Sequence, residues 1–116
     1  MLNRVVLVGH ITQEITLRYT QEGKAVANLT MAVGRRRGEN QKTDFIDVVV
    51  WEKLAELSAN HVGKGHLIAL VGRLQIHSYP SEGQVRRHAE VVADEIRFLK
   101  RPAAKEKPYS EDIMAT

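Results

Sequence analysis

The residues with the clearest chemical potential are aromatic and lie on one predicted strand, at residues 45–51. Side chains on a strand point alternately to opposite faces. One face therefore carries Phe45, Asp47, Val49 and Trp51, and the other carries Ile46, Val48 and Val50. Burying the charged carboxylate of Asp47 without a partner would cost free energy. We therefore predict that the aliphatic row faces the core and that the aromatic row faces outward.

Outward-facing aromatic rings beside cations are suited to stacking against unpaired nucleobases. Every base has a flat π-face, so this kind of stacking needs no particular base sequence. The segments that flank the strand are rich in Arg and Lys. The usual alternative is that an aromatic residue on a strand belongs to a core or a subunit interface. A separate core row already exists on the opposite face, which favours the binding interpretation.

The elements that must position this strand follow from the periodicity of the rest of the chain. Alternating apolar residues predict further strands over residues 3–11, 12–20, 25–33, 66–79 and 89–99. Gly9 in the first of them indicates a bulge or a close backbone approach. Helical spacing predicts one short helix over residues 52–62, which Gly63-Lys64-Gly65 ends.

Two predicted loops and one further strand add cations to the candidate interface. Residues 34–42, which contain three consecutive arginines, are typical of an exposed and mobile hairpin tip. The strand over residues 66–79 has a polar, partly cationic face made of Arg73, Gln75, His77 and Tyr79. Residues 80–84 read as a turn, and Arg86 and Arg87 follow it.

Composition and charge limit the classes of function. A chain of 116 residues with 43% hydrophobic and 27% charged residues is sufficient for one globular domain. The absence of Cys excludes a disulfide framework and a thiolate metal site. There is no long apolar run and no secretory leader, so we expect a cytoplasmic protein. The net charge of +3 is compatible with a polyanionic partner.

No pattern in the sequence indicates catalysis, a metal or a cofactor. The five histidines are scattered over different predicted elements and form no pair on one helix face. The sequence has no glycine-rich phosphate loop followed by Lys-Ser or Lys-Thr, and no local signature of a nucleophile with its base. We therefore expect a binding protein and not an enzyme.

Strands with one short helix between them, followed by two more strands, match the order of an OB-fold, a small all-β, five-stranded Greek-key barrel. Over about residues 1–100 the chain also resembles the bacterial single-stranded DNA-binding protein family. The segments that carry this resemblance are Asn3–Gly9, Leu17–Thr20, Ala25–Asn28, Phe45–Glu56, Lys64-Gly65 and Val71–Leu74.

The resemblance implies a homotetramer that binds single-stranded DNA without sequence preference in replication, recombination and repair. The family's base-stacking aromatics fall at Phe45, Trp51 and Tyr79. Its phosphate-contacting cations fall at Lys53 and Lys64, and Arg86 matches a basic loop position. We add as candidate DNA-binding residues the other nearby cations, which are Arg35, Arg36, Arg37, Arg73 and Arg87.

We expect residues 1–101 to form the OB-fold domain and residues 102–116 to form a short disordered tail. The tail lacks the long linker and the final Pro-Phe of relatives, which argues against recruitment of replication and repair proteins through it. This fits a specialised, phage-borne or plasmid-borne version. Two alternatives stay open: an OB module that prefers RNA, and a structural OB subunit whose aromatics form protein interfaces.

Overall fold

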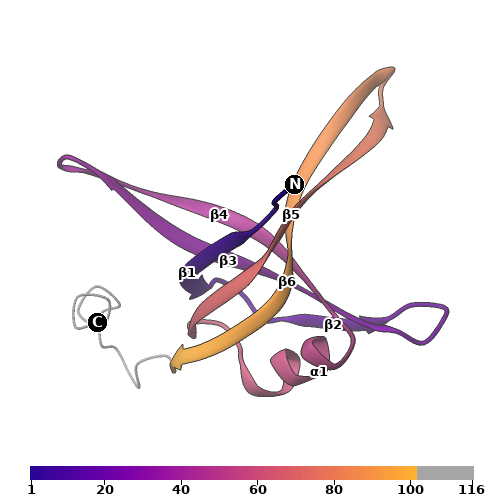
Figure 1. The fold of residues 1–116 in the computed structure, drawn as a ribbon, viewed down its shortest axis with the longest axis horizontal. Coiled ribbons are helices and arrows are strands. Elements are labelled where there is room, and N and C mark those ends of the chain that lie inside the picture. Colours follow the sequence, from indigo (N-terminus) through magenta and orange to yellow (C-terminus); the bar gives the residue numbers. More distant parts are fainter. Residues whose placement is uncertain (102–116) are drawn as a thin grey trace.

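The structure is a computed structural model that describes residues 1–101, and the predicted tail at residues 102–116 lies outside the described residues. The described chain is built mainly from strands, with one short helix (Figure 1). Its elements are β1 (Val5–Ile11), β2 (Thr16–Tyr19), β3 (Ala25–Arg37), β4 (Asn40–Trp51), α1 (Glu52–His61), β5 (Leu67–Ser81) and β6 (Gln84–Lys100).

Five of the strands close into a barrel. The sheet order is β1-β5-β6-β4-β3-β2, and an additional pairing of β1 with β3 closes the barrel. Strand β1 pairs with β5 over residues 5–10 and with β3 only at His10 and Ile11. Strands β4 and β6 run parallel, and the other neighbours are antiparallel. The predicted all-β OB-fold is therefore confirmed, with β2 as a short strand at the edge of β3.

The barrel interior follows the predicted alternation. Val48 and Val50 are buried, and Ile46 packs against the same core from a partly buried position. Val49 differs from its neighbours in the outward row because it is only 5% exposed. It lies in a small cluster with Val26 and Val92 on the outer side, where β3, β4 and β6 run side by side.

Two glycines allow strands to approach each other closely. A Cβ on Gly9 would lie 2.3 Å from the carbonyl oxygen of Ala32, and one on Gly72 would lie 2.1 Å from that of Val92. Both contacts are with backbone, which cannot move aside cheaply. The close approach predicted at Gly9 is confirmed, and Gly72 stands at a register shift between β5 and β6.

Two hairpins extend beyond the barrel in different directions (Figure 1). We call residues 34–43 the β3–β4 arm and residues 74–90 the β5–β6 arm. The predicted mobile tip over residues 34–42 is wrong in extent: β3 and β4 stay paired until Arg37 and Asn40. The β5–β6 ladder likewise continues to Ser81 and Gln84. The polar residues there have no apolar period, so the sequence ended β3 and β5 too early and began β4 and β6 too late.

Each arm ends in a two-residue turn. Gly38 has a φ of 62° in the first turn, and Glu82 and Gly83 have φ values of 52° and 78° in the second. Positive φ at these positions is the geometry of the tight hairpin turns that match strand twist. The turns therefore fix the register of both ladders.

Helix α1, the one helix among residues 1–101, is too short and too polar to cross a membrane.

Candidate nucleic-acid interface

The three predicted stacking residues lie on the same outer side of the sheet. Trp51 and Phe45 belong to the outward row of β4, and Val49 of that row is the register partner of Val92. Val92 is in turn the register partner of Arg73 on β5. Tyr79 follows Arg73 by six residues, an even number, so it lies on the same side of the strand. The exposed fractions are 68% for Phe45, 41% for Trp51 and 47% for Tyr79. The rings are therefore open to a ligand in this chain.

The register separates the predicted cations into groups. Arg36 lies on the side of Phe45, because its partner Gln41 is four residues before Phe45 on β4. Arg73 and Arg86 lie on that side as well, and Arg86 is the register partner of Tyr79. Arg35 and Arg87 lie on the other face of their ladders. Their register partners are Lys42 and Ser78 respectively. Arg37 pairs with Asn40 at the tip.

Two predicted cations lie outside the sheet, around α1. Lys53 is in the first turn of the helix, and Lys64 is in the segment between α1 and β5. Both are exposed. Glu52, between Trp51 and Lys53, has a φ of 61°, which is uncommon for a residue other than glycine. The chain therefore turns sharply into the helix directly after the Trp51 ring.

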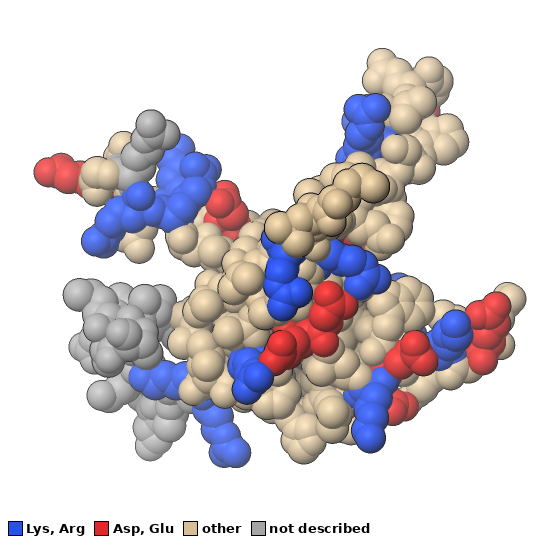
Figure 2. Space-filling view, in the orientation of Figure 1, with Lys and Arg blue, Asp and Glu red and all other residues tan. Residues whose placement is uncertain are grey.

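Ion pairs reduce the charge that some of these cations offer to DNA. Arg35 Nε lies 3.0 Å from Asp44 Oδ2, and Arg73 Nη1 lies 2.9 Å from Asp94 Oδ1. Arg36 makes no ion pair with any residue of the described range. Figure 2 shows that Lys and Arg gather on the β3–β4 arm and recur on the β5–β6 arm. The arms therefore carry Arg36 on the side of Phe45 and Arg86 directly across from Tyr79.

The gap between the arms is polar and acidic, a feature that sequence reasoning missed. His88 Nε2 lies 3.2 Å from Asp47 Oδ2, and His77 Nε2 lies 2.6 Å from Glu90 Oε1. Thr30 Oγ1 donates a hydrogen bond to Asp47 Oδ1 at 3.4 Å. A shallow cavity here is lined by Gln13, Glu14, Thr16, Asn28, Leu29, Thr30, Asp47, Val48, His88 and Glu90. The outward alternation of Asp47, and the place of His77 on the polar face of its strand, were the signals that could have indicated this site.

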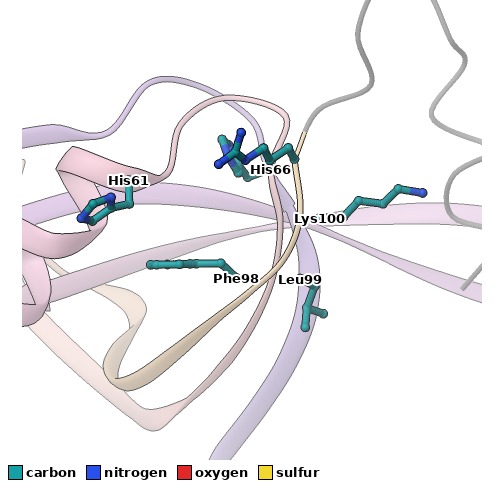
Figure 3. A pocket seen from close by; sticks show the side chains of 6 residues that line it. His61, His66, Phe98, Leu99 and Lys100 are labelled. Carbon is teal, nitrogen blue, oxygen red and sulfur yellow. The ribbon is translucent and has the colours of Figure 1, made fainter.

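A second cavity lies beside α1 and the end of β6 (Figure 3). It is lined by His61, His66, Phe98, Leu99, Lys100 and Arg101. In Figure 3, Leu99 and Lys100 extend away from His61. None of the predicted site residues lines this cavity. Among residues 1–101 there is no group of three His, Cys, Asp or Glu that could hold a metal ion.

Comparison with known proteins adds independent information. The model of the single-strand binding protein family matches residues 2–99. The single-stranded DNA-binding protein of Clostridium tetani is 47% identical over 102 residues, which cover 84% of this chain and 70% of that protein. That of Halalkalibacterium halodurans is 49% identical over 104 residues, covering 85% and 61% respectively.

A third relative, single-stranded DNA-binding protein 3 of Clostridium acetobutylicum, is 44% identical over 102 residues. These residues cover 84% of this chain and 71% of that protein. The chain therefore spans 61% to 71% of the length of these three relatives. With this identity and a family match over nearly the whole described barrel, the chain belongs to the single-strand binding protein family.

Proposed function

We propose that this chain binds single-stranded DNA without sequence preference. The observation that carries the proposal is the placement of three exposed rings, Phe45, Trp51 and Tyr79, on one outer side of the barrel. The relatives described above are named single-stranded DNA-binding proteins, which agrees with this use of the rings. The function is therefore binding and not catalysis.

Stacking supplies most of the affinity in this mechanism. In single-strand-binding proteins generally, one base stacked on an aromatic ring is worth about 1–3 kcal/mol. Cations on the arms, with Lys53 in the first turn of α1 and Lys64 after the helix, contact phosphates and set the path of the strand. On a single strand, each neutralised phosphate contributes about −0.7 to the slope of log K against log salt.

We also propose that the protein assembles as a homotetramer through β1. Residues 5–9 of β1 pair with β5 along one edge, and in the described chain their other edge has no ladder partner. Val6 and Val8 are exposed on the same strand. An unpaired apolar strand edge is a natural place for a second copy to pair. Four copies would let one strand reach several sets of rings. Light scattering that finds a monomer at micromolar concentration would contradict this assembly.

The cellular role that goes with this function is protection of single strands in replication, recombination and repair, on the nucleoid in the cytoplasm. Recruitment of other proteins through residues 102–116 is not part of the proposal.

The stacking proposal is tested with two matched phenylalanines. Phe45 lies on the proposed interface and Phe98 lies beside α1, yet both are exposed. Phe45→Ala should weaken the affinity for an oligo-dT by about 1–3 kcal/mol, or roughly 5- to 150-fold. Phe98→Ala should leave it within about twofold, since no stacked base is lost. Equal effects of the two changes, measured by fluorescence anisotropy, would refute the assigned interface.

Two further measurements separate the alternatives. A structural subunit whose rings form protein interfaces would show little change in Trp51 fluorescence when oligo-dT is added, whereas a stacked base should quench it. An RNA-binding module would be displaced from oligo-dT by poly-U more readily than by poly-dT. The proposed function predicts quenching of Trp51, and it predicts that poly-dT is at least as good a competitor as poly-U.

A further inference from the structure

Two histidine–carboxylate pairs occupy the gap between the arms, on the side that carries the aromatic rings. His77 and His88 are register partners on β5 and β6, and both alternate with Tyr79 and Arg73 on the outer side. His77 Nε2 contacts Glu90 Oε1 at 2.6 Å, and His88 Nε2 contacts Asp47 Oδ2 at 3.2 Å. The first pair lies within one arm. The second pair links β6 to β4.

The position of the second pair places it in the path between the rings. Strands β4 and β6 are paired only where Val48 and Val49 meet Val91 and Val92. Beyond these pairs the arms separate, as Figure 1 shows. Phe45 lies on one side of the gap and Tyr79 on the other. A strand that stacks on both rings must therefore cross the histidine–carboxylate pairs.

The charge of this gap depends on the two histidines. The charged groups on this side beside them are Asp47 from β4, Glu90 on β6, Arg86 beside Tyr79, and Arg73, whose charge is paired with Asp94. With neutral imidazoles, the two carboxylates of Asp47 and Glu90 outnumber the one guanidinium of Arg86, which is unpaired within residues 1–101, and the gap repels phosphate. With both imidazoles protonated, the same groups carry no net negative charge. An imidazolium can also donate a hydrogen bond to a phosphate oxygen.

We propose that binding of single-stranded DNA by this chain is coupled to protonation of His77 and His88. The inference rests on the proposed function and adds a regulation of the same site. A phosphate in the gap favours the imidazolium form, so the complex takes up protons that the free protein lacks. By linkage, affinity must then rise as the pH falls.

The experiment measures the affinity for oligo-dT between about pH 5.5 and about pH 8, the range spanned by His titration, at constant ionic strength. The wild-type chain should bind about tenfold more tightly at the acidic end, which corresponds to an uptake of about one proton over one pH unit of this range. The double variant His77→Gln with His88→Gln keeps neutral hydrogen-bonding groups and should bind with little dependence on pH.

Two further variants complete the test. His61→Gln removes an exposed histidine at the end of α1, away from the gap, and should keep the wild-type pH profile. Asp47→Asn with Glu90→Gln removes the repulsion and should bind more tightly than wild type at the alkaline end. Thermal melts establish that each variant is folded.

The possible failures are distinguishable. If the double histidine variant keeps the wild-type pH profile, the proton coupling is wrong, while the proposed function stands. If the wild-type chain binds no oligo-dT at any pH, the proposed function is wrong and the coupling falls with it.

Discussion

The barrel and the two arms are formed by the same strands, but they place their side chains in different surroundings. In the barrel each of β4, β5 and β6 has a neighbour on both edges, and alternate residues such as Leu70 and Val50 are fully buried. In the arms each strand has one partner, and nearly every described side chain is exposed on both sides.

This difference separates the requirements of folding from those of binding. Barrel positions must fit a densely packed interior, so their residues are aliphatic or glycine. Arm positions need only maintain a two-stranded ladder, so they can carry arginine, histidine and exposed rings at little cost in packing. Changes at buried barrel positions should therefore alter stability, whereas changes in the arms and at the exposed rings of Phe45 and Trp51 should alter binding.

The largest expected effect comes from two leucines on the same side of β5. Leu70 is 0% exposed in the barrel, whereas Leu74, four residues later, is 45% exposed at the base of the arm. Leu70→Ala should lower the free energy of unfolding by about 2–5 kcal/mol, since it leaves a cavity. Leu74→Ala should cost less than about 1 kcal/mol, since little buried area is lost. Urea denaturation measures both, and similar losses would show that the arm shares the barrel's packing.

A smaller effect compares two neighbouring arginines within one arm. Arg36 lies on the side of Phe45, whereas Arg35 lies on the other side and is paired with Asp44. Arg36→Ala should reduce the steepness of the salt dependence of oligo-dT binding by about 0.7, the value for one phosphate on a single strand. Arg35→Ala should leave the slope almost unchanged. Equal slopes for the two variants would mean that DNA uses both sides of the arm.

Much of the barrel could be predicted from the sequence, because burial imposes a period. The core row of Val48 and Val50, the outward placement of Phe45 and Trp51, and the close approach at Gly9 were all predicted and are found. The order of the strands and the single helix also followed from changes of period.

The arms could not be predicted to the same extent, for a physical reason. Their residues are exposed on both sides, so no apolar period marks where β3 or β6 begins or ends. The pairs Arg35–Asp44 and His88–Asp47 depend on register and on the way the two hairpins diverge. Register is fixed by the two-residue turns, whose exact position the sequence left open by several residues. The acidic gap therefore emerged only in three dimensions.

The smallest effect tests whether the barrel gains much stability from its exposed contacts. Tyr19 on β2 is exposed, and its Oη donates a hydrogen bond to Glu56 Oε2 of α1 at 3.0 Å. The hydrogen bond to Glu56, and then the negative charge of that residue, raise the pKa of Tyr19 above its usual value of 10.0. If stability resides in burial, loss of this contact should matter far less than loss of the Leu70 side chain.

The direction of the pH dependence follows from that raised pKa. A group whose pKa is higher in the folded chain contributes stability below its unfolded pKa of about 10, and the contribution disappears as the pH rises through the folded value. Tyr19→Phe should therefore unfold at a slightly lower urea concentration than wild type near pH 8, and this difference should shrink above about pH 10. Glu56→Gln keeps an acceptor but removes the charge, so it should bring the ultraviolet titration of Tyr19 back toward that of an ordinary tyrosine. A deficit as large as that of Leu70→Ala would show that an exposed contact between β2 and α1 stabilises the barrel as much as its core does. A small deficit that is constant across this pH range would show that the raised pKa of Tyr19 does not contribute to stability.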